Sequence, residues 1–369
     1  MKLSERIQVL YELGSFLELY YANPKKIKLN EFYKKLEMAI NDSILLNPYF
    51  EKENIIYNLN CWAKTLQKSN LESFVSQHSF NDKISNVGII MAGNIPLVGF
   101  HDFLCVFLSG NKSYVKLSRK DSSLFKFIID FLINQYKEIS KYVKIVENKL
   151  VNYDAIIATG NDLSANQFKK YFNKVPNIIR SSRHSIAVLN GNESNDDLKK
   201  LSFDIFMYYG LGCRSVSKLY IPEKLDINLI IDQLKSWSSV LNNSAYYNNY
   251  IYNKTIYLMK GEKIIDTGFV IIKESYEIGS PISTLFYERY NDIRELNKQL
   301  KQKQNKIQCI ISNNIVENST KFGSSQSPSI DDYADKINTM DFLLKLSWKS
   351  NHNYNLFFVT LHFLKYEKT

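Results

Sequence analysis

The sequence predicts an α/β protein with two mostly parallel β-sheets and a helical segment in front of them. Three observations carry this prediction. Residues 1–80 show apolar side chains at helical spacing, short apolar runs alternate with longer amphipathic runs from residue 87, and a second alternation of the same kind begins at Ile186. Strands that alternate with helices at this spacing imply βαβ units and parallel sheets.

The individual elements follow from the period of the apolar residues. Ile7, Leu10 and Leu13 lie on one face of a helix near the start of the chain. Strands are expected at 87–91, 113–117, 155–158, 186–189, 219–221, 269–272, 284–286 and 307–311. Helices are expected at 97–108, 124–136, 164–172, 229–241 and, at the end of the chain, 333–348, after a polar loop at 323–329.

This order of elements suggests four parts. We expect an N-terminal helical segment at 1–80, a ligand-binding α/β domain at 81–185, a second α/β domain at 186–330, and a C-terminal segment at 331–369 that packs back on the body. A chain of 369 residues is long enough for two such cores.

Composition excludes several classes of protein. With 45% hydrophobic and 23% charged residues the chain is typical of a soluble globular protein. Four cysteines without a CxxC pair, and five histidines without an HExxH pattern, predict neither a disulfide scaffold nor a metal site. The net charge of +10 comes from scattered lysines, so no nucleic-acid partner is expected.

One apolar stretch, residues 87–110, resembles a membrane span in length. Asn94, Pro96, His101 and Asp102 interrupt it, and each is costly or disruptive in hydrocarbon. A buried strand, a turn and a helix fit it better. The first residues carry charges and no long apolar core, which argues against a secretory signal. We therefore expect a cytoplasmic protein without a membrane span.

Cys213 is the strongest candidate for a chemical role. It follows Gly210 and Gly212, which allow unusual backbone conformations and close approach of a ligand, and it precedes Arg214. Backbone N–H groups and a neighbouring cation both favour the thiolate form, so we interpret Cys213 as a nucleophile. The other cysteines (Cys61, Cys105 and Cys309) lie in apolar surroundings that predict buried packing.

Three further turns follow predicted strands. Asn94 and Pro96 follow the first strand, and an asparagine amide there can donate into the crevice where open α/β sheets bind ligands. Lys116, Ser118 and Arg119 end the second strand and offer donors for ribose or phosphate. Thr159 and Gly160 end the third strand before a helix whose N–H groups suit a pyrophosphate, although the GxGxxG fingerprint is absent.

The order of these stretches resembles one family, the acyl-CoA reductases of the LuxC type, within the aldehyde dehydrogenase superfamily. The resemblance spans roughly residues 85–350 and implies an aldehyde-dehydrogenase-like fold. It is carried by residues 91–103, 171–180 and 185–193, the segment around Cys213, and 332–335 with 339–340.

The resemblance also implies roles for matching positions. Cys213 corresponds to the thiol nucleophile, and the side-chain amide of Asn94 joins the Cys213 backbone N–H in the oxyanion hole. Lys116 corresponds to a lysine that contacts the cofactor ribose. Thr159 and Gly160 match a turn near the cofactor.

Glu277 resembles a glutamate that holds the nicotinamide ribose, although the glycine and serine after it are displaced from the family pattern.

Two departures from the hydrolytic aldehyde dehydrogenases bear on the reaction. The stretch 188–191, compared with their Glu-Leu-Gly-Gly motif, has no carboxylate, although Glu193 lies close by. An acyl-enzyme without a water-activating base would persist until it is reduced. In addition, Ser118-Arg119-Lys120 replaces the glutamate that favours a free ribose hydroxyl, and this favours NADPH over NADH.

We therefore predict an NADPH-dependent reductase that converts a long-chain acyl-CoA to an aldehyde through an acyl-cysteine on Cys213. One alternative is a related reductase that uses an acyl phosphate or a thioester bound to a carrier or partner protein. Another is a non-catalytic interaction subunit. By resemblance, we expect homo-oligomers and allow for an acyl-transferring protein partner.

Overall fold

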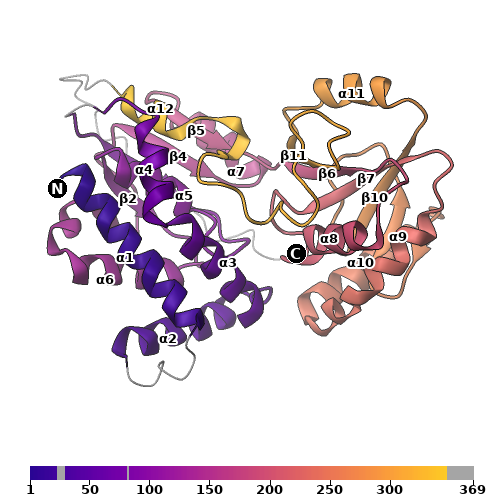
Figure 1. The fold of residues 1–369 in the computed structure, drawn as a ribbon, viewed down its shortest axis with the longest axis horizontal. Helices are drawn as coiled ribbons and strands as arrows, with labels where there is room; N and C mark the ends of the chain where they lie inside the picture. Colours follow the sequence, from indigo (N-terminus) through magenta and orange to yellow (C-terminus); the bar gives the residue numbers. More distant parts are fainter. Residues whose placement is uncertain (23–29, 81–82, 347–369) are drawn as a thin grey trace.

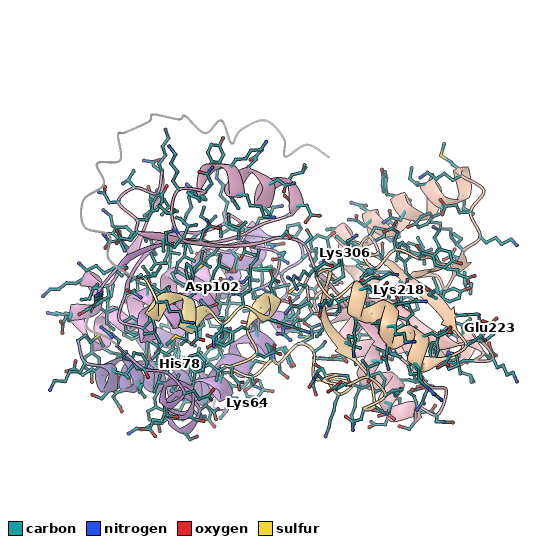
Figure 2. The ribbon with its side chains drawn as sticks, turned by 90° about the horizontal axis from the view of Figure 1, so that it is seen from above. Lys64, His78, Asp102, Lys218, Glu223 and Lys306 are labelled. Carbon is teal, nitrogen blue, oxygen red and sulfur yellow. The ribbon has the colours of Figure 1, made fainter. Side chains whose placement is uncertain are left out.

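The computed structural model describes residues 1–22, 30–80 and 83–346. Two α/β halves lie side by side, each with its own sheet, and the C-terminal segment crosses from the second half back to the first (Figure 1). Figure 2 shows the same halves from above, with Lys64, His78 and Asp102 in the first and Lys218 and Glu223 in the second. The predicted fold class, two parallel-sheet halves after N-terminal helices, is confirmed.

Four helices open the chain, as the apolar spacing predicts. Asn30 caps the second of them by accepting from the N–H groups of Phe32 and Tyr33, a favoured role for asparagine at a helix start. The helices are α1 (Leu3–Ala22), α2 (Glu31–Leu46), α3 (Lys52–Thr65) and α4 (Lys68–Ser76).

Sheet A is wholly parallel, with the strand order β3-β2-β1-β4-β5. The chain builds outward on one side of β1 and then returns to build on the other, so the direction switches between β1 and β4. Its strands are β1 (Asn86–Ile90), β2 (Lys112–Lys116), β3 (Val143–Ile145), β4 (Ala155–Thr159) and β5 (Asn177–Arg180). Its helices are α5 (Phe100–Leu108), α6 (Ser123–Gln135) and α7 (Asp162–Tyr171), with a 3-10 turn, η2 (Lys137–Lys141).

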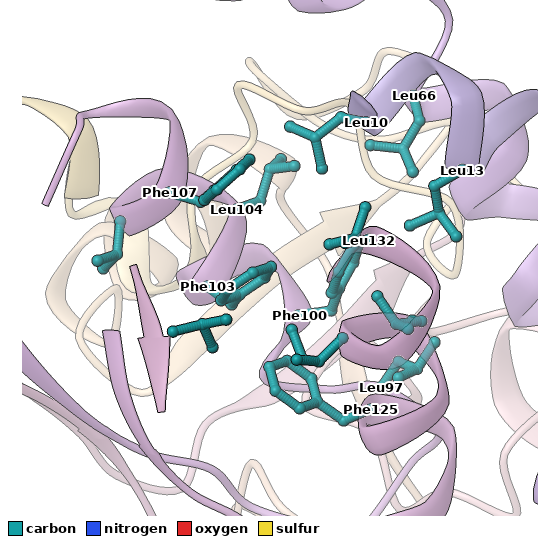
Figure 3. Close-up of a cluster of buried hydrophobic side chains, with 14 of the residues drawn as sticks. Leu10, Leu13, Leu66, Leu97, Phe100, Phe103, Leu104, Phe107, Phe125 and Leu132 are labelled. Atoms are coloured by element: carbon teal, nitrogen blue, oxygen red, sulfur yellow. The ribbon is translucent and has the colours of Figure 1, made fainter. Parts of the chain in front are cut away.

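The stretch at 87–110 is therefore a strand, a turn and a helix, as predicted. The helix begins at Phe100 rather than at Leu97, because Leu97 has a left-handed φ of 53° that a helix does not accept. Apolar side chains of α1, α5 and α6 interlock to form the core of this half (Figure 3). Within the described residues, no helix is both long and apolar enough to cross a membrane.

Sheet B has the strand order β11-β6-β7-β10-β9-β8 and is parallel except for β8. Lys218 in β7 is fully buried, pairs with Glu288 in β10, and lies over the ring of Tyr220. The strands are β6 (His184–Val188), β7 (Val216–Pro222), β8 (Ile265–Asp266), β9 (Ile271–Glu274), β10 (Thr284–Tyr290) and β11 (Ile307–Ile311). The helices are α8 (Asn195–Phe206), α9 (Ile227–Leu234), η3 (Lys235–Asn242), α10 (Ser244–Met259) and α11 (Ile293–Gln302).

The predicted helix at 333–348 is wrong over most of its described length. Asp335 and Lys336 adopt left-handed φ values, so the chain forms only a 3-10 turn, η4 (Ala334–Lys336), before a short helix, α12 (Thr339–Leu344). Residues 347 and 348 lie outside the described residues. We call residues 329–341 the C-terminal strap, because they run across the junction between the two halves.

Buried polar contacts fix the C-terminal strap to the first half. The Arg180 guanidinium binds both oxygens of Asp102 at 2.7 and 2.8 Å and donates to the hydroxyl of Thr339 at 3.0 Å. The His101 ring lies 2.7 Å from the carbonyl of Ile330. Arg180 and Asp102 are 4% and 7% exposed, so this ion pair is a buried tie between β5, α5 and the strap.

Candidate active site

Cys213 lies in a turn at residues 210–215, between the end of α8 and the start of β7. We call it the Cys213 turn. It begins with Gly210, whose φ of +77° is unfavourable for other residues. Because the turn precedes β7, Cys213 stands at the amino edge of sheet B, where it is half-buried.

Three side chains from distant segments hold the Cys213 turn. Asn94 donates from Nδ2 to the carbonyl of Leu211 at 2.7 Å, and Ser185 donates from Oγ to the carbonyl of Cys213 at 2.8 Å. Gln326 donates to the hydroxyl of Ser215 at 3.4 Å. Asn94 comes from the turn after β1, so one hydrogen bond joins the carboxyl edge of sheet A to the turn that carries the thiol.

The electrostatic surroundings of Cys213 differ from the sequence expectation. Burial raises the pKa of the Cys213 thiol, while the neighbouring Arg214 and Arg180 partly oppose this and Asp335 adds to it. Arg214 is itself paired with Asp332 of the C-terminal strap at 2.8 Å. The prediction that Arg214 favours the thiolate is thus right. The prediction that the pKa of Cys213 is lowered overall is wrong, because desolvation disfavours the charged form.

This arrangement predicts how acylation of Cys213 depends on pH. The rate is expected to rise with pH and to keep rising above the ordinary cysteine pKa of about 8.5, because only the thiolate attacks. Arg214→Gln should move the profile to higher pH, and Asp332→Asn, which leaves Arg214 unpaired, should move it lower. The measurement is the rate of adduct formation at a series of pH values. Equal profiles for the three proteins would contradict the assignment.

The other cysteines are only partly as predicted. Cys105 is buried in α5, but Cys61 and Cys309 are half-buried. Cys309 Sγ lies 2.9 Å from the same Ser185 hydroxyl that holds the Cys213 carbonyl, and burial raises the pKa of Cys309 to about 11. Cys309 is therefore a protonated neighbour of the Cys213 turn at neutral pH.

All but one of the residues predicted to bind a cofactor lie at the carboxyl edge of sheet A. Lys116 ends β2 and donates to the carbonyls of Glu147 and Asn148. Ser118 lies against Gly93 so closely that a side chain at position 93 would clash with its hydroxyl. The turn after β1 can therefore rest on the end of β2 only because residue 93 is glycine.

Arg119 is exposed beside this edge, and Thr159 and Gly160 end β4. The Gly160 N–H donates to the carbonyl of Arg180 at 3.2 Å, which ties the end of β4 to the end of β5. Since the strand direction switches between β1 and β4, a crevice for a ligand is expected outside the carboxyl ends of these two strands. Thr159 and the turn after β1 that carries Asn94 lie on its two sides.

Glu277 comes from the other half. It is exposed in the segment between β9 and β10, and the next residue, Ile278, accepts at its carbonyl from the Ser217 hydroxyl at 3.0 Å. Ser217 is the second residue of β7, just after the Cys213 turn, and Gly279 packs against the ring of His184 at the start of β6. Glu277 thus lies at the amino edge of sheet B, the same edge as Cys213.

A cavity of about 460 Å³ is lined by none of the predicted site residues, but two of its lining residues connect it to the Cys213 turn. Tyr57 in its wall stacks edge-on against Phe203 and Tyr208, which lead into the Cys213 turn. Asp331, also in the lining, directly precedes Asp332, the partner of Arg214. Its lining combines α3 and α4 with residues 327–331 and is rich in amide and hydroxyl groups.

The sequence pattern of this site corresponds to a known family. The family described as "Acyl-CoA reductase (LuxC)" matches residues 18–245, more than half of the chain and including Asn94 and Cys213. The chain belongs to the LuxC acyl-CoA reductase family. As a family member it is an aldehyde-forming oxidoreductase. No curated protein matches it.

Solved structures support the fold of this LuxC family member. Aldehyde dehydrogenase 21 from Physcomitrella patens, in complex with the product succinate, is 11% identical with a TM-score of 0.69 over 94% of this chain and 84% of that one. The aldehyde dehydrogenase KauB from Pseudomonas aeruginosa is 12% identical with a TM-score of 0.62 over 84% and 72%. An indole-3-acetaldehyde dehydrogenase in complex with NAD⁺ is 12% identical with a TM-score of 0.60 over the same shares.

The structure corrects one comparison made from the sequence of this LuxC family member. Residues 188–191 lie at the carboxyl end of β6, whereas Cys213 lies at the amino edge of the same sheet. Glu193 is held there by the N–H groups of Asn190 and Gly191 at 2.7 and 3.0 Å. Because β6 and β7 are parallel, neither this stretch nor Glu193 faces the thiol, and the strand end that influences Cys213 is that of β5, at Arg180.

The sequence of this reductase gave no role to three residues that the structure connects to Cys213. Ser185 lies in a stretch that matched the family, but a hydroxyl in a buried strand carries no local signal for what it will bind. Asp332 and Arg180 also lay in matching stretches without a role. The available signal was that Asp332 and Arg180 are charged, lie in matching motifs and have no predicted ligand. Such residues could have been expected to form ion pairs within the protein.

Proposed function

We propose that the protein reduces a long-chain acyl-CoA to an aldehyde through an acyl-cysteine on Cys213, with NADPH as the cofactor. The observation that supports this most is the hydrogen bond between Asn94 and Leu211 across the junction. It places a side-chain amide from the carboxyl edge of sheet A beside the turn that carries the thiol. We propose the same division for the domains: residues 81–185 bind the cofactor and residues 186–330 carry the thiol.

The positions of Cys213 and Asn94 support a role for each in the reaction. The Cys213 thiolate attacks the thioester carbonyl, and CoA leaves as its thiolate. Asn94 Nδ2 has a second hydrogen beyond the one given to Leu211, and together with the Cys213 N–H it can stabilise the oxyanion. The next addition to the acyl-cysteine carbonyl produces an oxyanion at the same place, so the same donors serve both halves of the reaction.

The site fits a nicotinamide dinucleotide in its donor set. At the end of β2, Lys116 and Arg119 supply cations and Ser118 supplies a hydroxyl for phosphate and ribose groups. Thr159 and Gly160 lie on the far side of the switch point. Glu277 comes from the amino edge of sheet B. A nicotinamide cofactor supplies the hydride that reduces the acyl group. The chain's own task is to hold the acyl group on Cys213 until then.

The pairing of Asp335 and Asp102 with arginines supports reduction over hydrolysis. Asp335, the acid that acts on the pKa of Cys213, is paired with Arg183 at 3.1 Å. Asp102 is bound on both oxygens by Arg180. Neither Asp335 nor Asp102 is therefore free to activate a water molecule against the acyl-cysteine.

We propose that the acyl-CoA reaches Cys213 through the cavity of about 460 Å³ beside the strap. Asn60, Asn70 and Gln77 line it, and amide side chains suit the two amides of a pantetheine arm. Lys64 is exposed at this cavity and offers a cation to a phosphate group.

The test is the intact mass of the protein after mixing with a long-chain acyl-CoA in the absence of NADPH. An acyl adduct should form on the wild type and on Cys309→Ala but not on Cys213→Ala, and it should disappear when NADPH is added. An adduct on Cys213→Ala would show that Cys213 is not the nucleophile. An adduct that survives NADPH would overturn the reduction step or the cofactor.

Replacing Arg119 tests the proposed preference for NADPH over NADH. If its guanidinium binds a 2′-phosphate, Arg119→Glu should weaken NADPH binding about tenfold or more, the loss expected for a charge-assisted hydrogen bond, and leave NADH binding nearly unchanged. Lys126→Glu, an exposed lysine in α6 with the same change of charge, is the control. Both dissociation constants can be measured by cofactor fluorescence. Equal losses for NADPH and NADH would contradict the assignment.

A further inference from the structure

The turn that carries Asn94 has an unusual backbone. Residues 93–98, here called the Asn94 turn, connect β1 to α5, and Leu97 within it has a left-handed φ of 53°. A bulky residue is unfavourable in this conformation, so surrounding contacts must hold it there. Leu97 is almost fully buried, which supplies part of that support.

Two buried polar side chains hold the ends of the Asn94 turn. At one end, Asn47 after α2 donates to the carbonyl of Gly93 at 2.9 Å. At the other end, the N–H groups of Leu97 and Val98 face the carboxylate of Asp121 and stabilise its charged form. Asp121 also contacts the Gly93 end, because a side chain at position 93 would come within 3.2 Å of its Cβ.

Asp121 lies in surroundings where an acid lowers the stability of the fold. It is 5% exposed, and its Oδ1 atom has no hydrogen-bond partner within the described part of the chain. Within the described residues no cation pairs with Asp121, and the neighbouring Arg119 and Lys120 are exposed. Burial therefore raises the pKa of Asp121 to about 7. A buried, unpaired acid lowers stability, and its presence under the Asn94 turn calls for a role there.

We propose that Asp121 is a positioning residue for Asn94. Its carboxylate holds the N–H groups of Leu97 and Val98, keeps Leu97 left-handed, and so fixes the direction from which Asn94 reaches the Cys213 turn. The chain of contacts runs from Asp121 through the backbone of the Asn94 turn to Asn94, and from Asn94 to Leu211 at 2.7 Å. This inference rests on the proposed function, because it assigns Asp121 to the acylation of Cys213.

The test is a double-mutant cycle on the rate of Cys213 acylation, with Asp121→Asn, Asn94→Ala and the double variant. Asn94→Ala should lower the rate about 100-fold or more, as for the loss of one oxyanion donor. Asp121→Asn, which keeps the shape and removes the charge, should lower it about tenfold. In the Asn94→Ala background the same Asp121→Asn change should alter the rate less than about twofold, because residues that act through one another are not additive.

A tenfold loss from Asp121→Asn in both backgrounds would overturn the inference, as would no loss in either. Asp130→Asn, an exposed acid in α6, is the matched control and should acylate like the wild type. If neither the wild type nor Asp130→Asn is acylated, the proposed function fails instead. Should Asp121→Asn not fold, Asp121→Ser, whose hydroxyl can still accept one of the N–H groups, enters the same cycle.

Discussion

Replacing Cys213 by alanine is expected to reduce turnover of acyl-CoA by about 10⁴-fold or more, the size of loss seen when a covalent nucleophile is removed. Within the described residues, the Cys213 turn is held through its backbone carbonyls and through the side chains of Arg214 and Ser215, and not through the Cys213 thiol. The thiol itself is not needed to hold the turn, so the variant should fold, and the loss should appear in turnover and not in thermal stability.

Cys105→Ala is the matched control for this prediction, because it removes a thiol from a buried helix of the other half. Its turnover should stay within a few-fold of the wild type. The measurement is aldehyde formation with saturating acyl-CoA and NADPH. If Cys213→Ala retained a substantial part of the wild-type rate, the acyl-cysteine would not lie on the reaction path.

The second large effect is on stability. Arg180→Ala is expected to lower the free energy of unfolding by about 3–5 kcal/mol, because it leaves Asp102 as an unpaired charge in a buried position. It also removes the donor to Thr339, so the C-terminal strap loses one of its ties. Urea unfolding measures the change.

The double variant Asp102→Ala/Arg180→Ala separates the ion pair from simple loss of packing. It leaves no unpaired charge, so it should lose less stability than the sum of the two single variants. Arg183→Ala removes the partner of Asp335 in the same strap, and it should have a smaller effect than Arg180→Ala because the Arg183 side chain is less buried than that of Arg180. Full additivity of Asp102→Ala and Arg180→Ala would show that the pair is not a coupled unit.

The fold could be predicted from the sequence where the signal is local. The strands at 87–91, 155–158 and 307–311 are short apolar runs, and each lies within one residue of the observed strand. The C-terminal strap could not be predicted in this way. Its apolar spacing resembles a helix, but Asp335 and Lys336 adopt left-handed conformations, and Asp332 and Asp335 bind arginines far away in the chain.

In the candidate site, too, the residues with a local sequence signal could be predicted and the others could not. Asn94 and Cys213 stand in turns with glycine and proline, which sequence patterns reveal. Ser185 and Asp121 act through contacts that form only after the sheets have packed, so nothing in their own neighbourhood distinguishes them. The comparison of 188–191 with a hydrolytic motif failed for a related reason, because sequence similarity does not tell which end of a strand faces the thiol.

The C-terminal strap has a consequence for the making of the protein. A ribosome releases Cys213 well before residues 332–339, which supply the partner of Arg214 and the hydroxyl that Arg180 binds. While the chain is being synthesised, both arginines lack these partners and the turn with the thiol is incomplete. The thiol therefore reaches its final surroundings only after residues 332–339 have been synthesised, and a chain that stops before them carries its cysteine without these contacts.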